Sequence, residues 1–371
     1  MTGHAEQVLA PAVAAVAPRT AFGGPVPDFA PMRGIVTHER TAELAPELIA
    51  LLTRLLGRAH LTARHEWPAL ELTLGDTDTY DDSVMWMRDY MPLYVRDSRG
   101  ALSAWYALSD NENRARYRSR HDRLSDGRGQ QLPLILEQGN VVTTGTKLFA
   151  TEQLLSENHE LLDDDHLLES GYRRRNEREI RRLLARATQR QTNDVVLLPP
   201  MPYEATGHVD MFLLPLDDDT VVVPAMENEA LAMSPPGRSR HVGKVIQVFL
   251  DEQADYLSSL GLEVLRLPMV PPATTTDIDE QSHEEQEVEL VVFTPANSLL
   301  LNIAGKRRVI VPSFDNVAAD PKVRALFARY TASWMNTFRQ RGWEAHSADA
   351  SGLVSYLGLF RCVSAPVPLA D

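Results

Sequence analysis

The chain has 371 residues, of which 44% are hydrophobic and 24% are charged, and its formal net charge at pH 7 is -14. This length and apolar content are enough for a sizeable core, which argues against disorder of the whole chain. The acidic balance excludes a general nucleic-acid binder, which needs clustered Lys and Arg, and favours a small cationic ligand.

The N-terminal segment is rich in Ala and Pro, as in VLAPAVAAVAP. Because prolines interrupt it and no basic stretch precedes it, we interpret residues 1–31 as a disordered arm, with a secretory signal as the alternative. No segment has the roughly 18 uninterrupted apolar residues of a membrane span. We therefore expect a cytoplasmic protein that does not bind membranes. No linker rich in Gly and Ser divides residues 32–371, which are predicted to form a single catalytic domain.

Strands and helices alternate along this domain. Apolar and β-branched runs bounded by Gly, Pro, Asn and Asp predict strands. Helical patterns cover Ala42–Leu56, Glu152–Ala187, Gly243–Leu260 and Asp320–Arg341. The segments LPLDDDTVVV and LLNIAGKRRVIV have the short polar turns of hairpins. About five units of paired strands and a helix can be counted, which predicts an α/β protein.

Two charged runs have a structural interpretation. DIDEQSHEEQEVE, residues 277–289, lacks the ligand spacing of a calcium loop and is interpreted as a solvated loop. GYRRRNEREIRRLLARATQR is interpreted as a helix with an exposed basic face and i,i+4 pairs such as Arg173 with Glu177. Neither run is expected to carry the function.

Three acid/base residues lie at the ends of predicted strands. WMRDY places Asp89 at an expected strand end, and TGHVDMF places His208 and Asp210 just before an apolar run. In an extended segment residues two apart share a face, so His208 and Asp210 should project together. Burial of both without partners is unfavourable, so they either satisfy each other or serve a site. Asp89 and Asp210 could then face one cation.

Cys362, the only cysteine, lies in GLFRCVSAPVP after a predicted strand. A single cysteine excludes an intramolecular disulfide and a cysteine-based zinc cluster. A lone cysteine is often a small buried hydrophobe. With the distant His208, however, it has the arrangement from which a thiolate nucleophile and its general acid/base are built.

Together these motifs resemble the agmatine deiminase and bacterial (Porphyromonas-type) peptidyl-arginine deiminase family of guanidine-modifying enzymes. WMRDYMP resembles the WxRDxGP motif, EQGN the EGGN segment, and TGHVDMF the GHxD motif. PANSLLLN resembles the asparagine-containing strand, and CVSAPVP the terminal nucleophile. The resemblance extends from about Gly34 to the C-terminus. It implies the pentein fold, a five-bladed pseudo-symmetric propeller of ββαβ units with the active site in a central channel.

The resemblance also implies a reaction. Arginine or a C-terminal peptidyl-arginine would be hydrolysed to citrulline and ammonia through a covalent thiouronium intermediate on Cys362. Asp89 and Asp210 would hold the guanidinium nitrogens, while His208, oriented by Glu137, would transfer protons. No metal and no organic cofactor is expected, because substrate and thiolate already supply the electrophile and the nucleophile.

Four further residues would contact the substrate. The resemblance implies that Trp86 packs on its alkyl stem and that Asn297 contacts it or lines the pocket. DNENRARYRSR resembles an Asn-Arg-x-Arg pattern whose two arginines, here Arg114 and Arg116, face the substrate's α-carboxylate. Such a pair binds a carboxylate bidentately and would repel the ammonium of agmatine, which favours free arginine or an arginine-containing peptide. A basic surface loop is the open alternative.

The chain departs from the family pattern at several positions. Gln138 replaces the second glycine of EGGN, Met91 replaces the glycine of WxRDxGP, and a glycine-rich run is reduced to Gly-Leu-Phe at 358–360. These bulky residues predict a reshaped pocket. Arg361 stands where the family usually has histidine before the nucleophile. If it points inward it should lower the thiol pKa, and otherwise it would contact an acidic substrate.

Several alternatives therefore stay open. The chain could be an agmatine deiminase, an amidinotransferase acting on a divergent guanidine substrate, or a catalytically inactive guanidinium-binding protein. The sequence does not fix the oligomeric state, and we allow for a homo-oligomer.

Overall fold

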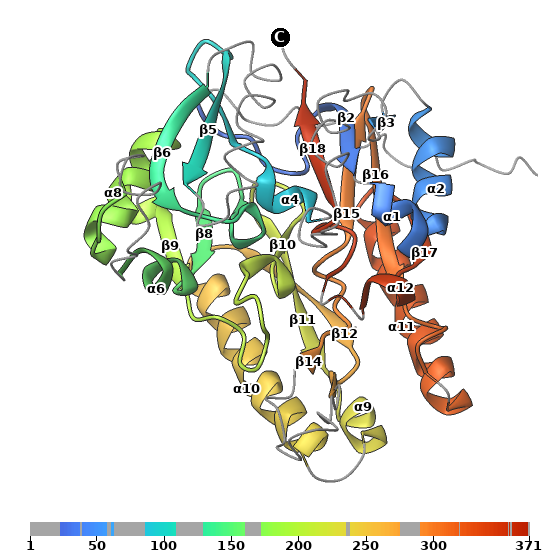
Figure 1. Cartoon of the computed structure of the whole chain (residues 1–371). Coiled ribbons are helices and arrows are strands. Elements are labelled where there is room, and N and C mark those ends of the chain that lie inside the picture. Colours follow the sequence, from blue (N-terminus) through green and yellow to red (C-terminus); the bar gives the residue numbers. More distant parts are fainter. Residues whose placement is uncertain are drawn as a thin grey trace, which may run out of the picture.

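The computed structural model describes residues 23–37, 39–57, 61–62, 86–108, 129–159, 172–234, 238–274, 290–318, 320–354, 356 and 358–369. In these ranges separate mixed sheets lie toward the middle of the molecule and the longer helices lie outside them (Figure 1). No helix within this described part has the length and apolarity to cross a membrane.

Short strands form these sheets. In chain order they are β1 (Gly24–Pro25), β2 (Met32–Thr37), β3 (Leu61–Thr62), β4 (Leu93–Arg96), β5 (Leu102–Leu108), β6 (Gly129–Ile135), β7 (Val142–Thr143), β8 (Leu148–Thr151), β9 (Val195–Leu198), β10 (Leu214–Pro215), β11 (Thr220–Met226), β12 (Glu263–Met269), β13 (Ala273–Thr274), β14 (Leu290–Val291), β15 (Leu299–Ile303), β16 (Lys306–Ser313), β17 (Glu344–Asp349) and β18 (Ser364–Pro368).

Five sheets repeat one pattern, in which a strand pairs antiparallel with a second strand that pairs parallel with a third. They are β4-β5-β6, to which β1 adds an antiparallel edge, β7-β8-β9, β10-β11-β12, β15-β16-β17 and β18-β2-β3. The strands β13 and β14 form a separate antiparallel pair. The α/β class is confirmed. Each sheet is open among the described strands, so the closed five-bladed arrangement stays a prediction.

The helices connect and cover these sheets. They are α1 (Glu39–Leu44), α2 (Pro46–Leu56), α4 (Met87–Tyr90), α6 (Gln153–His159), α8 (Glu177–Ala187), α9 (Asn228–Met233), α10 (Arg238–Ser259), α11 (Pro321–Gln340) and α12 (Ser351–Val354). The predicted helix Asp320–Arg341 is confirmed as α11, whose N-terminus is capped by the Asp320 carboxylate accepting from the Lys322 amide at 2.7 Å. The predicted helix Gly243–Leu260 is confirmed as the larger part of α10.

Two predicted helices are divided. Ala42–Leu56 breaks between α1 and α2 because Pro46 disfavours helical geometry at the residue before it. A continuous helix over Glu152–Ala187 is wrong, since residues 172–176 are not helical and Asn176 caps a new helix by accepting from the Glu179 amide.

The expected ion pair in the basic run is also wrong. Arg173 lies before α8 and therefore pairs with Glu179 at 3.7 Å, whereas Glu177 pairs with Arg181 one helical turn later at 2.7 Å. The acidic run 277–289 lies outside the described residues.

Both predicted hairpins are confirmed. In the turn between β15 and β16, Ala304 and Gly305 have φ angles of 51° and 74°, the left-handed pair that suits a two-residue hairpin. In the turn between β10 and β11, the Asp217 carboxylate accepts from the Thr220 amide at 2.7 Å.

The predicted disordered arm is wrong for residues 23–31. Gly24 and Pro25 pair with β4, and Phe29 is buried in the hydrophobic core. This segment therefore belongs to the folded body. Residues 1–22 lie outside the described residues, and the assignment of 32–371 as a single domain stays a prediction.

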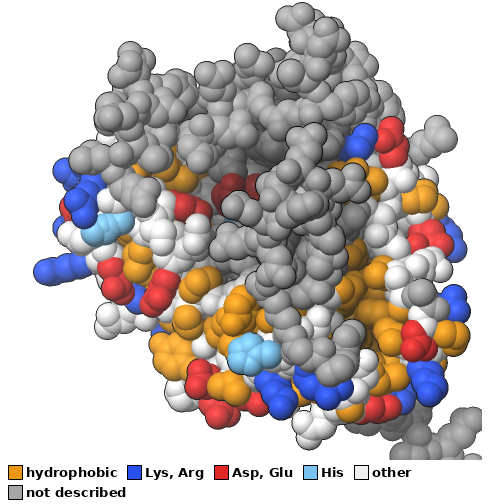
Figure 2. Space-filling view, turned by 60° about the horizontal axis from the view of Figure 1, so that its bottom comes forward, with side chains coloured by type: hydrophobic (Ala, Val, Ile, Leu, Met, Phe, Trp, Pro, Cys, Tyr) orange, Lys and Arg blue, Asp and Glu red, His pale blue; other side chains and the backbone are white. Residues whose placement is uncertain are grey.

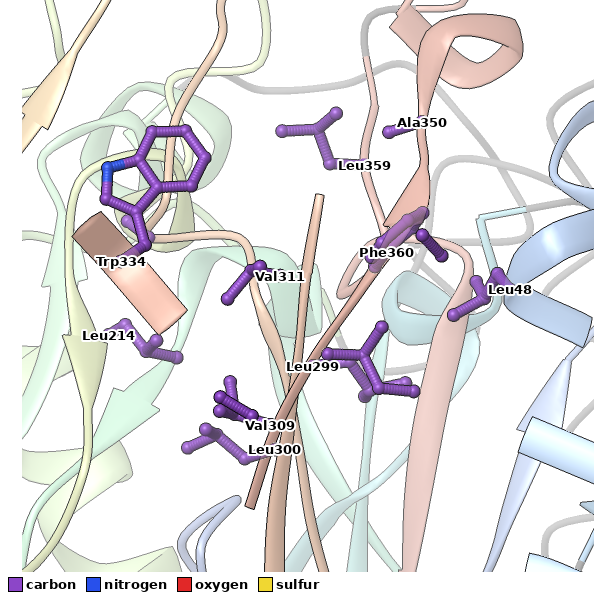
Figure 3. Close-up of a cluster of buried hydrophobic side chains, with 14 of the residues drawn as sticks. Leu48, Leu214, Leu299, Leu300, Val309, Val311, Trp334, Ala350, Leu359 and Phe360 are labelled. Carbon is purple, nitrogen blue, oxygen red and sulfur yellow. The ribbon is translucent and has the colours of Figure 1, made fainter. Parts of the chain in front are cut away.

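The core explains the bulky residues before the nucleophile. Leu359 and Phe360 are buried with Leu299 of β15 and with Val309 and Val311 of β16 (Figure 3). Their side chains therefore anchor the loop that carries Cys362 in the core. The predicted reshaping of the substrate pocket stays a prediction.

Candidate active site

The candidate site gathers residues from five segments that are distant in sequence. Figure 2 shows some acidic side chains set back from the surface on one face of the molecule. The predicted site residues within the described chain are Trp86, Asp89, Glu137, His208, Asp210, Asn297 and Cys362. Arg114 and Arg116 lie outside the described residues.

Asp89 lies in the one-turn helix α4, so its predicted place at a strand end is wrong. The helix follows Trp86 directly, and the Arg88 amide donates to the Cys362 carbonyl at 3.0 Å. The Asp89 Oδ1 accepts from the Gly139 amide at 2.9 Å. Asp89 is thereby joined to the EQGN segment, while its own helix holds the nucleophile loop.

Trp86 depends on a neighbouring glycine. A Cβ built on Gly358 would lie 2.0 Å from the Trp86 Cζ3 atom, so only a glycine leaves room for this ring. The remaining glycine of the family's glycine-rich run thus has a packing reason.

His208 and Glu137 form a close pair. The His208 Nε2 atom lies 2.8 Å from the Glu137 Oε2 atom. The imidazole is buried, and a Cβ on Gly139 would lie 2.4 Å from its Nδ1 atom. Gly139 therefore allows the ring to approach the backbone, and Glu137 is placed to orient it, as the resemblance implies.

His208 and Asp210 do not lie on a strand. The residues Val209–Met211 form a turn of 3₁₀-helix, labelled η6, and β10 begins only at Leu214. The predicted geometry, in which residues two apart in an extended segment share a face, is therefore wrong. Both side chains are nevertheless buried at the site.

Asn140 is a positioning residue that the motif comparison left without a role. Its buried Oδ1 atom accepts from the Thr151 amide at 2.8 Å and from the Val209 amide at 3.3 Å. It thus ties the EQGN segment to the turn that carries Asp210. The signal was its place in EQGN, where only Glu137 had been assigned.

Asn297 contacts both the side chain and the backbone of Cys362. Its Nδ2 atom lies 3.3 Å from the Cys362 Sγ atom, and its Oδ1 accepts from the Arg361 amide at 2.9 Å and the Cys362 amide at 3.3 Å. Burial raises the pKa of the Cys362 thiol well above its usual range, and the carboxylates of Asp210 and Asp89 raise it further. Any lowering of the thiol pKa by Arg361 is therefore outweighed by burial and by these two carboxylates.

Arg361 points inward and binds two carboxylates of its own chain. Its Nε donates to the Asp28 Oδ2 at 2.7 Å and its Nη2 lies 2.6 Å from the same oxygen, while its Nη1 lies 3.0 Å from the Asp210 Oδ2. Its side chain is 2% exposed. Contact with an acidic substrate, the other expectation, is therefore wrong.

Arg88 completes a quartet with the buried Arg361 and Asp210 and the half-buried Asp28. Its Nη1 donates to the Asp28 Oδ1 at 3.1 Å, and its Nε donates to the Arg361 carbonyl at 3.0 Å. Burial raises the pKa of Asp28, but the two guanidinium groups outweigh it and hold this pKa at about 2. Sequence reasoning missed Asp28, because its two partners are 60 and 333 residues away.

For Asp210, in contrast to Asp28, burial outweighs the neighbouring positive charges. Its side chain is fully buried, and burial raises its pKa to about 6 although Arg361, His208 and Arg88 lower it. Neither of its carboxylate oxygens accepts a hydrogen bond from any residue that the structure describes. Buried acceptors are usually satisfied, so this carboxylate has capacity for the donors of a ligand.

Asp89, Glu137 and His208 bring one ligand atom each within 4.8 Å of one another. A metal ion could bridge such a group. However, His208 and Glu137 already form a close pair, and Asp89 accepts from the Gly139 amide, an arrangement that also suits proton transfer. The expectation of a site without metal or cofactor stays a prediction.

Comparisons with solved structures give the same fold. The agmatine deiminase of C. jejuni has a TM-score of 0.61 and 14% identity, with 93% of this chain and 96% of that chain covered. A variant of that enzyme with substrate bound also has a TM-score of 0.61 and 14% identity, covering 94% and 97%. The agmatine deiminase of Enterococcus faecalis has a TM-score of 0.57 and 14% identity, covering 92% and 94%.

The sequence comparisons differ in what they detect. A search of curated protein sequences gives no match. The model of the Porphyromonas-type peptidyl-arginine deiminase family, in contrast, matches residues 58–368. The chain therefore belongs to the Porphyromonas-type peptidyl-arginine deiminase family of guanidine-modifying enzymes, which are hydrolases acting on C–N bonds of guanidino groups.

Proposed function

We propose that this protein hydrolyses a C–N bond of a small cationic guanidine compound with Cys362 as the nucleophile. One observation carries the proposal: the fully buried Asp210 carboxylate, which pairs with Arg361 but accepts no hydrogen bond from the described residues, lies at the same site as the Cys362 thiol and the His208–Glu137 pair. A planar guanidinium presents the paired N–H donors that such a carboxylate lacks.

The thiol requires activation, because burial and two carboxylates disfavour its charged form. A guanidinium held between Asp89 and Asp210 would neutralise these carboxylates and supply a positive charge beside the sulfur. Substrate binding therefore lowers the thiol pKa and generates the thiolate only where it can react.

The reaction then proceeds in two halves. The Cys362 thiol gives its proton to His208, and the thiolate attacks the guanidinium carbon. A C–N bond breaks, and the ammonia leaves with the proton that His208 took from the thiol. Water, deprotonated by His208, attacks the resulting thiouronium carbon. The C–S bond breaks, which releases the ureido product and restores the thiol. Glu137 stabilises the protonated imidazole and fixes its orientation.

The fold assigned to this activity is the five-bladed propeller. Its support is the repetition of one antiparallel-then-parallel strand pattern in five sheets, together with the fold similarity to agmatine deiminases. In such an arrangement the five sheets surround the channel in which Asp210 and Cys362 meet.

The proposed substrate is free arginine or a C-terminal arginine of a peptide. Arg114 and Arg116 match the pattern that faces an α-carboxylate, and Trp86, whose ring lies against Gly358, would pack on the alkyl stem. The Arg114→Ala substitution should raise KM for carboxylate-bearing substrates and leave KM for agmatine unchanged. Equal effects on both kinds of substrate would contradict the proposed carboxylate contact.

The function is tested by measuring ammonia and ureido product from agmatine, free arginine and a peptide ending in arginine. We expect turnover of the two carboxylate-bearing compounds, and none with Cys362→Ala. Turnover of agmatine alone would identify an agmatine deiminase. Loss of the guanidine without ammonia, on addition of an acceptor amine, would identify an amidinotransferase. Binding without turnover would identify an inactive guanidinium-binding protein. Retained activity in Cys362→Ala would exclude the covalent mechanism.

A further inference from the structure

The guanidinium of Arg361 interacts with two carboxylates in different ways. The Nε and Nη2 atoms face the Asp28 Oδ2 at 2.7 and 2.6 Å, and Nε donates a hydrogen bond to it. Nη2 also donates to the Val141 carbonyl at 3.4 Å. The Nη1 atom lies 3.0 Å from the Asp210 Oδ2 but makes no hydrogen bond within the described structure. Arg361 thus hydrogen-bonds Asp28 and acts on Asp210 by charge alone.

This difference distinguishes two roles. An arginine that chelated Asp210 would occupy both carboxylate oxygens and would compete with any guanidine substrate. An arginine that approaches without hydrogen bonding supplies charge and leaves the lone pairs of both oxygens available. The geometry matches the second role.

Asp28 and Arg88 hold Arg361 in this arrangement. The carboxylate of Asp28 is itself fixed by Arg88, whose Nη1 donates to its Oδ1 at 3.1 Å. Arg88 also donates through Nε to the Arg361 carbonyl at 3.0 Å and so holds the backbone of Arg361. Backbone and guanidinium of Arg361 are therefore both held from the Asp28 side.

We propose that Arg361 is a positioning residue that serves as the internal counterion of Asp210, and that Asp28 keeps its guanidinium from chelating Asp210. The inference rests on the proposed function for the identity of what Asp210 binds. The charge of Asp210, however, can be measured without substrate.

Other charged groups also face Asp210 and are part of the expected balance. Arg88 and His208 favour its ionised form, whereas Asp89 opposes it, and the Cys362 thiolate would oppose it as well. Because the substitutions below leave these groups in place, a change in the titration of Asp210 reports on Asp28 and Arg361.

The test is an infrared titration of the substrate-free, full-length protein. The carbonyl band of protonated Asp210 is assigned by its loss in Asp210→Asn. In the wild type we expect a midpoint near the Asp210 pKa of about 6. In Arg361→Gln the midpoint should rise by about one unit or more, because the counterion is gone. In Arg361→Lys, which keeps the charge, it should stay nearer to the wild-type value.

The Asp28→Asn substitution is expected to shift the midpoint of the Asp210 titration in the opposite direction. Without Asp28 the Arg361 guanidinium turns toward Asp210, so the midpoint should fall. Arg329→Gln, which removes an exposed pair with Glu229, is the matched control and should change nothing. An unchanged or raised midpoint in Asp28→Asn would overturn the proposal. This outcome can be read even if circular dichroism shows that Arg361→Gln does not fold. An unchanged midpoint in a folded Arg361→Gln would overturn it equally.

Kinetics separate this proposal from the function itself. With whichever of the three guanidine compounds the wild type hydrolyses, Asp28→Asn should raise KM more than it lowers kcat, because Arg361 then competes for Asp210. A kcat loss with unchanged KM would contradict the competition. A wild type that hydrolyses none of the three would refute the proposed function and leave the titration result standing.

Discussion

Asp28 and Asp210 bind the same arginine from opposite sides and differ in almost every other respect. Asp28 uses both carboxylate oxygens, lies at a pocket with about 590 Å³ of empty volume including its opening, and has a side chain that is 15% exposed. Asp210 is fully buried and accepts no hydrogen bond from the described chain. Its pKa is raised to about 6, whereas that of Asp28 is lowered to about 2.

The difference teaches how to separate a structural carboxylate from a ligand-binding one. A nearby arginine does not distinguish them, since both have Arg361. The number of hydrogen bonds that the oxygens accept does distinguish them. A carboxylate whose oxygens all accept hydrogen bonds stabilises the fold, while a buried one without them destabilises the empty protein and has acceptors left for a ligand. Four substitutions or conditions test this comparison.

The largest expected effect is on catalysis by Asp210→Asn. Loss of the charge that holds the guanidinium should lower kcat/KM by about 10⁴-fold, or about 5 kcal/mol, with no loss of folding free energy. Steady-state kinetics and urea unfolding of the same preparation measure both. Asp251→Asn, which removes an exposed partner of Arg266, is the control. A parallel loss of stability would assign Asp210 to the structural class.

The converse change is Asp28→Asn. It leaves the buried Arg88 and Arg361 guanidinium groups without their shared partner, so the free energy of unfolding should fall by about 4 kcal/mol. Urea unfolding at neutral pH measures this. If the variant is as stable as the wild type, hydrogen bonding to both carboxylate oxygens is not a sign of a structural role at this position.

The two aspartates should also give stability opposite pH dependences. The pKa of Asp210 is raised from 3.8 to about 6, so its contribution is present below pH 3.8 and is lost as the pH rises through about 6. At 1.36 kcal/mol per pKa unit this is about 3 kcal/mol. The pKa of Asp28 is lowered to about 2, so its contribution is present above pH 3.8 and is lost as the pH falls through about 2.

This pH dependence is measured as the difference in unfolding free energy between the wild type and Asp210→Asn from pH 4 to 7. The wild type should lose stability relative to the variant across this range. A constant difference would mean that Asp210 has an ordinary pKa and is not held in an unfavourable site.

The smallest expected effect concerns the backbone beside the imidazole. A Cβ at Gly139 would lie 2.4 Å from the His208 Nδ1 and 2.9 Å from the Asp89 Oδ1. Gly139→Ala should therefore displace the ring and lower kcat by about 10²-fold, or about 2.7 kcal/mol. Gly24→Ala, where the nearest atom is 3.7 Å from the added Cβ, is the matched control. Unchanged kcat would show that the ring position tolerates the shift.

Local signals predicted much of this molecule. The cap at Asp320 and the turn at Ala304–Gly305 follow from chemistry within a few residues, and α11 and the β15–β16 hairpin were predicted correctly. Short motifs also predicted Asp89, His208, Asp210 and Cys362, which the structure brings near one another, while their roles stay predictions. What the motifs did not supply is local conformation, as shown by His208 and Asp210 around a 3₁₀ turn.

The quartet could not be predicted in the same way. Asp28 lies in a Pro-rich stretch that resembles a disordered arm, and its function in the fold depends on partners that only the tertiary structure brings near. Arg361 was noticed as an unusual residue, but its direction depends on the same distant carboxylate. Near Asp28 in the sequence, the one feature that pointed to burial was the large apolar side chain of Phe29, which is buried.

The pairing of β18 with β2 has a consequence for the biosynthesis of the site. Cys362 lies two residues before β18, whose Ser364 pairs with Thr37, and the Thr37 hydroxyl donates to the Val363 carbonyl at 3.0 Å. The ribosome makes β18 after every other described strand, so Asp89, His208 and Asp210 can be in place before Cys362 emerges. The thiol joins them only when the last strand closes a loop of more than 300 residues onto one of the first, a late and slow step. Until β18 pairs with β2, Asp89, His208 and Asp210 can be in place while the Cys362 sulfur is still outside the site.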